Sequence, residues 1–173
     1  MTRIDEIADG IRTVGVIGLG TMGSGIVQTC LMAGYPVVAW DADEVAARRG
    51  KEKVEGGIKK FAEKGKIEAD QVEPMLGRLS LASELGDFSS CDIVIEAVVE
   101  REDVKFDLFR KLDEICPEGA IFASNTSSIS ITKIAAVTRR AERFIGMHFM
   151  NPVPLMKLIE VIRGLDTSDE TYQ

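Results

Sequence analysis

The fold is decided by the stretch Thr13-Val-Gly-Val-Ile-Gly18-Leu-Gly20-Thr-Met-Gly23 near the start of the chain. Its first five residues form a short β-branched run that ends in glycine, as in a buried parallel strand. The glycines that follow have the spacing G-x-G-x-x-G, and a helix is predicted over residues 22–33. Gly34 marks the end of that helix, and residues 36–40 are predicted as a second strand. These elements form a βαβ unit.

Each glycine of this segment has a physical role in binding a dinucleotide. Gly18 permits a tight turn, Gly20 lets the backbone approach a pyrophosphate, and Gly23 lets the helix pack closely on the strand. The N–H groups at the helix start point at the phosphates and attract their charge. The cofactor-binding residues predicted here are Gly18, Leu19, Gly20, Thr21, Met22 and Gly23.

An acid ends the second strand where a ribose-binding residue is expected. Asp41 lies 18 residues after Gly23, and the dinucleotide fingerprint has an acid about 20 residues on. Its carboxylate would accept hydrogen bonds from the adenosine ribose, and Asp43 and Glu44 beside it would repel a 2′-phosphate. NAD is therefore expected rather than NADP. The alternative is a glycine turn followed by an unrelated aspartate.

The rest of the chain continues the alternation of strands and helices. Helices are predicted at residues 103–115 and 131–136. Further strands are predicted at residues 92–96, 120–124, 143–148 and 157–162. This order predicts an α/β fold, a doubly wound Rossmann-type sheet that is mostly parallel and can carry an antiparallel edge strand.

Residues 44–79 interrupt this alternation with a charged, helical segment. Val54, Ile58 and Phe61 recur at helical spacing, and Gly65 breaks the pattern. We therefore predict a helical hairpin, inserted after the second strand and laid on the sheet.

Composition limits the classes of function. The chain has 173 residues, of which 45% are hydrophobic, as expected for one domain over residues 13–173 after an N-terminal extension of residues 1–12. The net charge of −7 disfavours nucleic acid and anionic membranes as partners.

Residues 13–40 carry no charge and would be long enough to cross a bilayer. Glycines and Pro36 divide this span, and the acidic N-terminus does not resemble an export signal. The three cysteines are widely spaced and accompany a single histidine, which argues against a disulfide framework or a metal site. We expect a cytoplasmic protein that binds no metal.

His148, the only histidine, ends an apolar strand just before Asn151-Pro-Val-Pro154, a predicted rigid loop. Twelve residues after it, Glu160 interrupts an apolar run, where a carboxylate is costly unless it is paired. A histidine oriented by a carboxylate is a general acid or base for a hydroxyl proton while a hydride leaves the same carbon. The alternative is a structural histidine, and the sequence does not fix the register of the pair.

Five small polar residues, Ser124-Asn-Thr-Ser-Ser128, follow a strand at the edge of the sheet where α/β folds bind ligands. They could contact a ligand. Ser127 or Ser128 is also expected to cap the next helix.

Several segments carry a resemblance to a known family. They are Gly18-Leu-Gly-Thr-Met-Gly-Ser-Gly25, Ile95-Glu-Ala-Val-Val-Glu100, Ser124-Asn-Thr-Ser-Ser128, Gly146-Met-His-Phe-Met-Asn-Pro-Val-Pro154 and Met156-Lys-Leu-Ile-Glu160. Together they resemble the NAD-binding domain of the L-3-hydroxyacyl-CoA dehydrogenases, and the 3-hydroxybutyryl-CoA dehydrogenases most of all.

The resemblance implies roles for particular residues. His148 would be the catalytic base, Glu160 would hold it, and Ser127 would bind the substrate oxygen. Cofactor contacts are implied for Asp41, Glu100, Lys105, Asn125 and Asn151.

Lys64 aligns with a lysine that contacts CoA in the family. It belongs to a segment, residues 48–66, with eight basic and three acidic side chains, a net charge of +5. This segment is either a CoA phosphate site or an ordinary solvated helix face.

The resemblance implies NAD-dependent oxidation of L-3-hydroxyacyl-CoA to 3-oxoacyl-CoA, or reduction of acetoacetyl-CoA to 3-hydroxybutyryl-CoA. Family members continue into a helical C-terminal domain that covers the substrate and forms most of a dimer interface, and this chain stops at Gln173. We therefore expect an acyl-CoA substrate, a homo-oligomer for the full-length enzyme, and little activity from this chain alone. The alternatives are a non-catalytic NAD-binding module and a structural protein that keeps only the fold.

Overall fold

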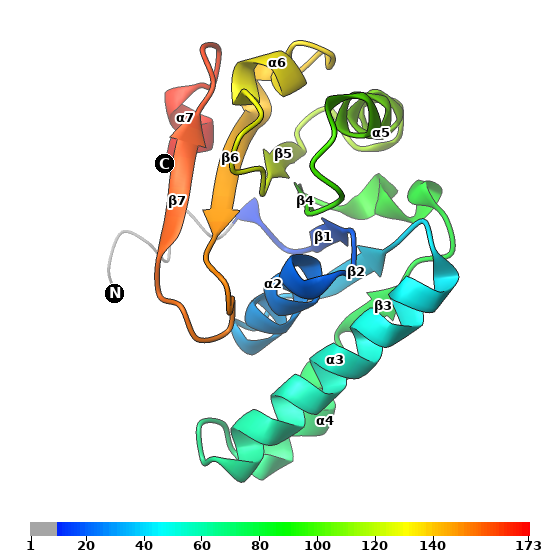
Figure 1. Cartoon of the computed structure of the whole chain (residues 1–173), viewed down its shortest axis with the longest axis vertical. Coiled ribbons are helices and arrows are strands. Elements are labelled where there is room, and N and C mark those ends of the chain that lie inside the picture. Colours follow the sequence, from blue (N-terminus) through cyan, green and yellow to red (C-terminus); the bar gives the residue numbers. More distant parts are fainter. Residues whose placement is uncertain (1–9) are drawn as a thin grey trace.

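The computed structural model describes residues 10–173, so residues 1–9 of the predicted extension lie outside the described part. A seven-stranded sheet has the order β3-β2-β1-β4-β5-β6-β7 (Figure 1). The strands are β1 Val14–Ile17, β2 Val37–Trp40, β3 Leu79–Leu81, β4 Ile93–Glu96, β5 Ile121–Ser124, β6 Phe144–Phe149 and β7 Ile159–Arg163. All neighbours are parallel except β7, which runs antiparallel to β6.

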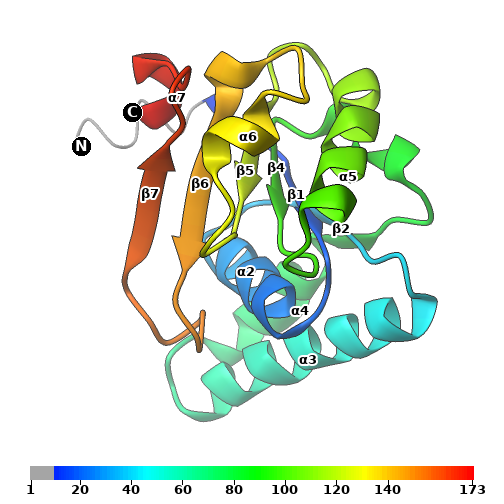
Figure 2. The same ribbon diagram turned by 45° about the horizontal axis from the view of Figure 1, so that its top comes forward.

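Helices follow most strands (Figure 2). The α-helices are α2 Thr21–Met32, α3 Glu44–Glu63, α4 Val72–Leu76, α5 Glu102–Ile115, α6 Ile131–Ala135 and α7 Asp169–Tyr172. Short 3₁₀ turns are η2 Ala69–Gln71, η3 Leu85–Ser90 and η4 Ala141–Arg143. The predicted α/β, doubly wound and mostly parallel fold is confirmed, and the antiparallel strand is at the edge.

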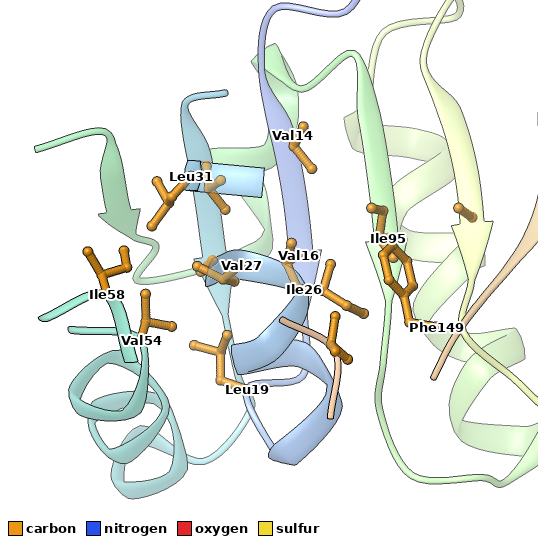
Figure 3. Close-up of a cluster of buried hydrophobic side chains, with 14 of the residues drawn as sticks. Val14, Val16, Leu19, Ile26, Val27, Leu31, Val54, Ile58, Ile95 and Phe149 are labelled. Atoms are coloured by element: carbon orange, nitrogen blue, oxygen red, sulfur yellow. The ribbon is translucent and has the colours of Figure 1, made fainter. Parts of the chain in front are cut away.

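Two hydrophobic clusters cover the two faces of the sheet, because successive strand residues point to opposite sides. On one face, Val16 of β1 packs with Ile26 and Val27 of α2 (Figure 3). On the other face, Phe122 of β5 packs with Phe109 of α5. The uncharged span of residues 13–40 is divided into β1, α2 and β2. Within residues 10–173, no helix is both long and apolar enough to cross a membrane.

The helical hairpin is present, but its predicted position on the sheet is wrong. Gly65 has a φ of +65° and breaks the segment after α3. The buried side of α3 packs mainly on α2. Gly57 makes this approach possible, because a Cβ there would lie 2.2 Å from Oε1 of Gln28 in α2. Gly50 lets α3 approach the glycine loop, because a Cβ there would lie 2.6 Å from the Cβ of Leu19. The hairpin also ends earlier than predicted, since β3 begins at Leu79.

The order of the strands positions the site. The neighbours β1 and β4 are followed by helices on opposite faces, which makes their carboxyl ends the switch point where such sheets bind ligands. Ile17 at the end of β1 is opposite Glu96 at the end of β4. The glycine loop and the segment after Glu96 therefore lie side by side.

A buried ion pair joins α5 to the segment that follows α6. Asp113 of α5 accepts hydrogen bonds from Arg140 Nε at 2.7 Å and from Arg139 Nε at 2.9 Å. The Asp113 and Arg140 side chains are 6% and 7% exposed. Burial would raise the pKa of Asp113, but the hydrogen bonds from Arg139 and Arg140 outweigh it, and the pKa lies below its usual value.

We expect Asp113→Asn to destabilise the fold by about 3 kcal/mol at pH 7, since it leaves Arg140 buried without its charged partner. A carboxyl whose pKa is lowered by folding contributes stability above its unfolded pKa of about 3.9, and this contribution is lost as the pH falls through the folded value. The difference in stability between the variant and the wild type should therefore be smaller at pH 3 than at pH 7. Urea unfolding at pH 7 and pH 3 measures this, and an equal difference at both values would contradict it.

Candidate active site

The glycine loop has the geometry that a dinucleotide requires. Gly18 has a φ of +90°, and a Cβ there would lie 2.6 Å from the carbonyl oxygen of Ala97. At Gly23 a Cβ would lie 1.6 Å from the carbonyl oxygen of Gly18, so only glycine lets α2 approach the loop this closely. A Cβ at Gly20 would meet nothing within 4 Å, so this position faces open space.

The start of α2 is free to bind an anion. Among residues 10–173 no side chain caps this end, and its first turn holds no acid. Its N–H groups therefore keep their capacity for phosphate oxygens. An NAD pyrophosphate fits here, against Gly20 and the first turn of the helix.

Asp41, the residue after β2, holds the glycine loop by hydrogen bonds. Its Oδ2 accepts a hydrogen bond from Leu19 N at 2.7 Å, and its Oδ1 accepts one from Asp43 N at 3.0 Å. The carboxylate is thus fixed beside the loop, where it can also accept from a ribose hydroxyl. Asp43 uses its own side chain to cap α3, accepting from Val45 N at 2.8 Å.

His148 and Glu160 meet across the sheet edge. They are direct partners in the antiparallel pairing of β6 with β7, and His148 Nδ1 lies 2.8 Å from Glu160 Oε2. A carboxylate at Nδ1 favours the tautomer that carries its proton there, so that Nε2 has a free lone pair. The predicted pairing is present, and Nε2 is available as a base.

Two cavities meet at His148. The first has a volume of about 340 Å³, and predicted site residues from four stretches of the chain are among its lining: Met22, Glu100, Lys105, Asn125, Ser127, His148 and Asn151. The second has about 330 Å³, and Ser127, His148 and Glu160 are among its lining residues. Ser127 and His148 therefore face both spaces.

The segment from Asn125 to Ser128, here called the hydroxyl loop, is anchored on Glu100. Glu100 Oε1 accepts hydrogen bonds from Thr126 Oγ1, from Ser127 N at 3.2 Å and from Ser128 Oγ at 3.0 Å. Burial would raise the pKa of Glu100, but the hydrogen bond from Thr126 and the charge of Lys105 outweigh it. The pKa is lowered, so Glu100 is ionised at neutral pH.

The prediction that Ser127 or Ser128 caps the next helix is wrong. The N-cap of α6 is Ser130, which accepts a hydrogen bond from Lys133 N. Thr126 Oγ1 accepts from Ile129 N at 3.0 Å and closes a turn before the helix. The Ser127 side chain therefore caps no helix, and Ser127 lines both cavities.

Three other predicted site residues differ in whether they line a cavity. Asn125 Oδ1 accepts from Phe149 N at 2.8 Å, which joins the ends of β5 and β6. Asn151 precedes Pro152 through a cis peptide bond and lines the first cavity. Lys64 is exposed at the end of α3 and lines neither cavity. The basic side chains of residues 48–66 are all exposed.

Two residues of the site were not predicted from the sequence. Glu96 is fully buried and contacts Lys105, which lines the first cavity, and Thr126 links Glu100 to the hydroxyl loop. A glutamate at the end of the apolar strand Ile93–Glu96 was the available signal, because such a charge needs a partner.

A doubly wound sheet, a glycine loop at its switch point and a histidine–carboxylate pair beside the adjoining cavity define the nucleotide-binding part of a dehydrogenase. The sequence model of the 3-hydroxyacyl-CoA dehydrogenase, NAD binding domain, matches residues 13–173. The chain belongs to this family, and its cofactor is NAD.

Named relatives agree with this assignment. A Deinococcus radiodurans protein named "Probable 3-hydroxybutyryl-CoA dehydrogenase" is 51% identical over 91% of this chain and 56% of its own length. The mitochondrial hydroxyacyl-coenzyme A dehydrogenase of Sus scrofa is 43% identical over 94% of this chain and 54% of its own length.

The crystal structure of (S)-3-hydroxybutyryl-CoA dehydrogenase from Ralstonia eutropha matches with a TM-score of 0.90 and 48% identity, covering 94% of this chain and 57% of that one. The chain thus spans about half the length of the relatives that it matches. The resemblance recognised in the sequence is confirmed.

Proposed function

We propose that this chain is the part of an NAD-dependent enzyme that binds the cofactor and carries His148 and Glu160. The enzyme oxidises L-3-hydroxyacyl-CoA to 3-oxoacyl-CoA, or reduces acetoacetyl-CoA to 3-hydroxybutyryl-CoA. One observation carries the proposal: His148, fixed by Glu160 at 2.8 Å, lines the same cavity as Met22 in the first turn of α2, where the NAD pyrophosphate fits.

In the oxidative direction, His148 Nε2 takes the proton of the C3 hydroxyl. Bound NAD supplies the acceptor for the hydride that leaves C3. Glu160 keeps Nδ1 protonated and stabilises the imidazolium that forms, without taking the proton itself. Ser127, beside His148 in both cavities, donates a hydrogen bond to the substrate oxygen. In the reductive direction, the His148 imidazolium returns the proton.

Cofactor contacts are proposed for the glycine loop, Asp41, Glu100, Lys105, Asn125 and Asn151. Glu100 and Lys105 line the same cavity as Met22, which supports their assignment to the nicotinamide half of the cofactor. Lys64 and its basic neighbours on α3 are proposed to bind the phosphates of CoA, since they are exposed and cationic.

We propose a domain over residues 13–173 after an extension of residues 1–12, and a homo-oligomer for the enzyme at its relatives' length. No nucleic acid or membrane partner is proposed. A cytoplasmic location is supported by three free cysteines, of which Cys91 and Cys116 are buried thiols.

Asp41→Asn tests the preference for NAD over NADP. The substitution removes the charge that repels a 2′-phosphate and weakens the acceptor of the ribose hydroxyls, so the Kd for NAD should rise by about tenfold. The Kd for NADP should rise less. Calorimetric titration measures both, and a parallel rise for the two cofactors would count against a ribose contact.

The proposed activity is tested by mixing NADH and acetoacetyl-CoA with a polypeptide of the relatives' full length and following NADH absorbance. We expect NADH to be consumed only when the acyl-CoA is present. NAD binding without consumption would instead support a non-catalytic module.

A further inference from the structure

Glu96 is a buried charge that the proposed mechanism does not use. It ends β4, and its side chain is 0% exposed. Its Oε1 accepts from Lys105 Nζ at 2.5 Å and from Val98 N at 2.7 Å, and its Oε2 accepts from Ser124 Oγ at 2.6 Å. Three donors therefore satisfy a carboxylate that would otherwise be costly to bury.

Lys105 carries the first link from Glu96 toward the site. Its side chain is 1% exposed, and Nζ lies between Glu96 Oε1 and Glu100 Oε2, the latter at 3.2 Å. Glu100 in turn binds Thr126, Ser127 and Ser128 of the hydroxyl loop. Glu96 thus reaches the loop through one cation and one carboxylate.

Ser124 carries a second link. Its hydroxyl donates to Glu96 and accepts from Thr126 N at 3.3 Å. The backbone adds a third contact, because Asn125 N donates to the carbonyl oxygen of Glu96 at 2.8 Å. Both side-chain routes meet at Thr126, so Glu96 contacts the two side chains, Lys105 and Ser124, that connect β4 to this part of the loop.

We propose that Glu96 is a positioning residue that fixes the hydroxyl loop and so places Ser127 beside His148. The inference rests on the proposed function for the role of Ser127 toward substrate. The ordering of the loop itself depends only on the contacts described.

The charges explain why a carboxylate is needed at this position. The Glu96 carboxylate balances the charge of Lys105. The Glu100 carboxylate is therefore free to accept hydrogen bonds from the loop. A neutral side chain at position 96 would leave Glu100 as the single carboxylate beside the buried Lys105. Glu100 would then be drawn toward the ammonium, and its bonds to Ser127 and Ser128 would weaken.

Amide hydrogen exchange of the 173-residue chain, followed by NMR, tests this directly. Glu96→Gln keeps the size of the side chain and removes its charge. We expect exchange at Ser127 N and Ser128 N to accelerate by about tenfold, because the Glu100 acceptor is displaced. Ser124→Ala, which removes one hydroxyl and leaves the ion pairs, should accelerate the same amides by a smaller factor.

Asp113→Asn is the matched control. It neutralises another buried, ion-paired carboxylate on the same side of the sheet, eight residues beyond Lys105 on α5, about 12 Å along the helix. It should lower the stability and change exchange at Ser127 and Ser128 by less than about twofold.

Unchanged exchange at both amides in Glu96→Gln would overturn the proposal, and so would equal acceleration in Asp113→Asn. If Glu96→Gln does not fold, Ser124→Ala decides the question by the same criterion. An NAD titration of the wild type separates the two claims: failure to bind NAD would reject the proposed function, while the exchange result would still decide the role of Glu96.

Discussion

His148→Gln is expected to lower kcat for the reduction of acetoacetyl-CoA by NADH by about 10²- to 10⁴-fold, the usual contribution of a positioned general acid or base. Glutamine has a similar reach but no group that titrates near neutral pH, so the C3 oxygen loses its proton donor. The Kd for NADH should change by less than about twofold, since His148 is proposed to contact the substrate oxygen and not the cofactor. Stopped-flow absorbance of NADH with a polypeptide of the relatives' full length gives kcat, and calorimetry gives the Kd.

Glu160→Gln should have a smaller effect than His148→Gln. The Glu160 side chain is 53% exposed, so water replaces part of its stabilisation of the imidazolium. Glu170→Gln is a matched control, because Glu170 is also exposed and also paired, with Arg143 at 3.6 Å.

A kcat for His148→Gln close to that of the wild type would exclude His148 as the acid–base group.

Gly23→Ala and Gly20→Ala should separate folding from cofactor binding. At Gly23 the new Cβ would lie 1.6 Å from the carbonyl oxygen of Gly18, a main-chain atom that cannot move without the loop. We expect a loss of about 3 kcal/mol in the free energy of unfolding, at the upper end for an overpacked site. At Gly20 the new Cβ meets open space, so stability should be nearly unchanged.

The same open space at Gly20 is where the pyrophosphate would approach the backbone. Gly20→Ala should therefore raise the Kd for NAD by at least about tenfold while the protein stays folded. Urea unfolding and calorimetric titration of the 173-residue chain measure the two effects. Gly56→Ala is the control, because Gly56 also has open space around a Cβ but lies within α3. Full NAD affinity in Gly20→Ala would contradict the assigned position of the pyrophosphate.

Much of the fold could be predicted because its strands are short, buried and separated by helices. The strand predicted at residues 13–17 is observed as Val14–Ile17, and the helix predicted at residues 103–115 as Glu102–Ile115. β3 was missed because it is a three-residue edge strand, and only Leu79 among its residues is partly buried. Short, exposed strands give no periodic signal.

The position of the hairpin could not be predicted for a different reason. The apolar spacing of Val54 and Ile58 shows that α3 buries one side, but not what that side covers. Gly57 lets α3 lie against Gln28 of α2, and Gly50 lets it lie against Leu19 of the glycine loop. The sequence pattern identifies neither of these neighbours.

The residues of the candidate site were named from the sequence, but the hydrogen bonds and ion pairs between them were not. The apolar run around Glu160 predicted a costly buried carboxylate in need of a partner; the partner, His148, is present, but β7 is exposed and the Glu160 side chain is 53% exposed. The direct cross-strand pairing depends on the length and turn of residues 150–158. We recognised Glu96 only as a member of the segment Ile95-Glu-Ala-Val-Val-Glu100, without a role of its own. Its contacts with Lys105 and Ser124 join β4, α5 and β5, and such tertiary contacts have no local pattern.

The proposed hydride transfer to C3 is tested by a deuterium-transfer measurement. Acetoacetyl-CoA is incubated with a polypeptide of the relatives' full length and NADH that carries deuterium at both C4 positions, and the product is analysed by mass spectrometry. We expect 3-hydroxybutyryl-CoA with one deuterium on C3, formed about 10²- to 10⁴-fold more slowly by His148→Gln. A reduced product without deuterium on C3, or no product from a protein that binds both ligands, would contradict this transfer.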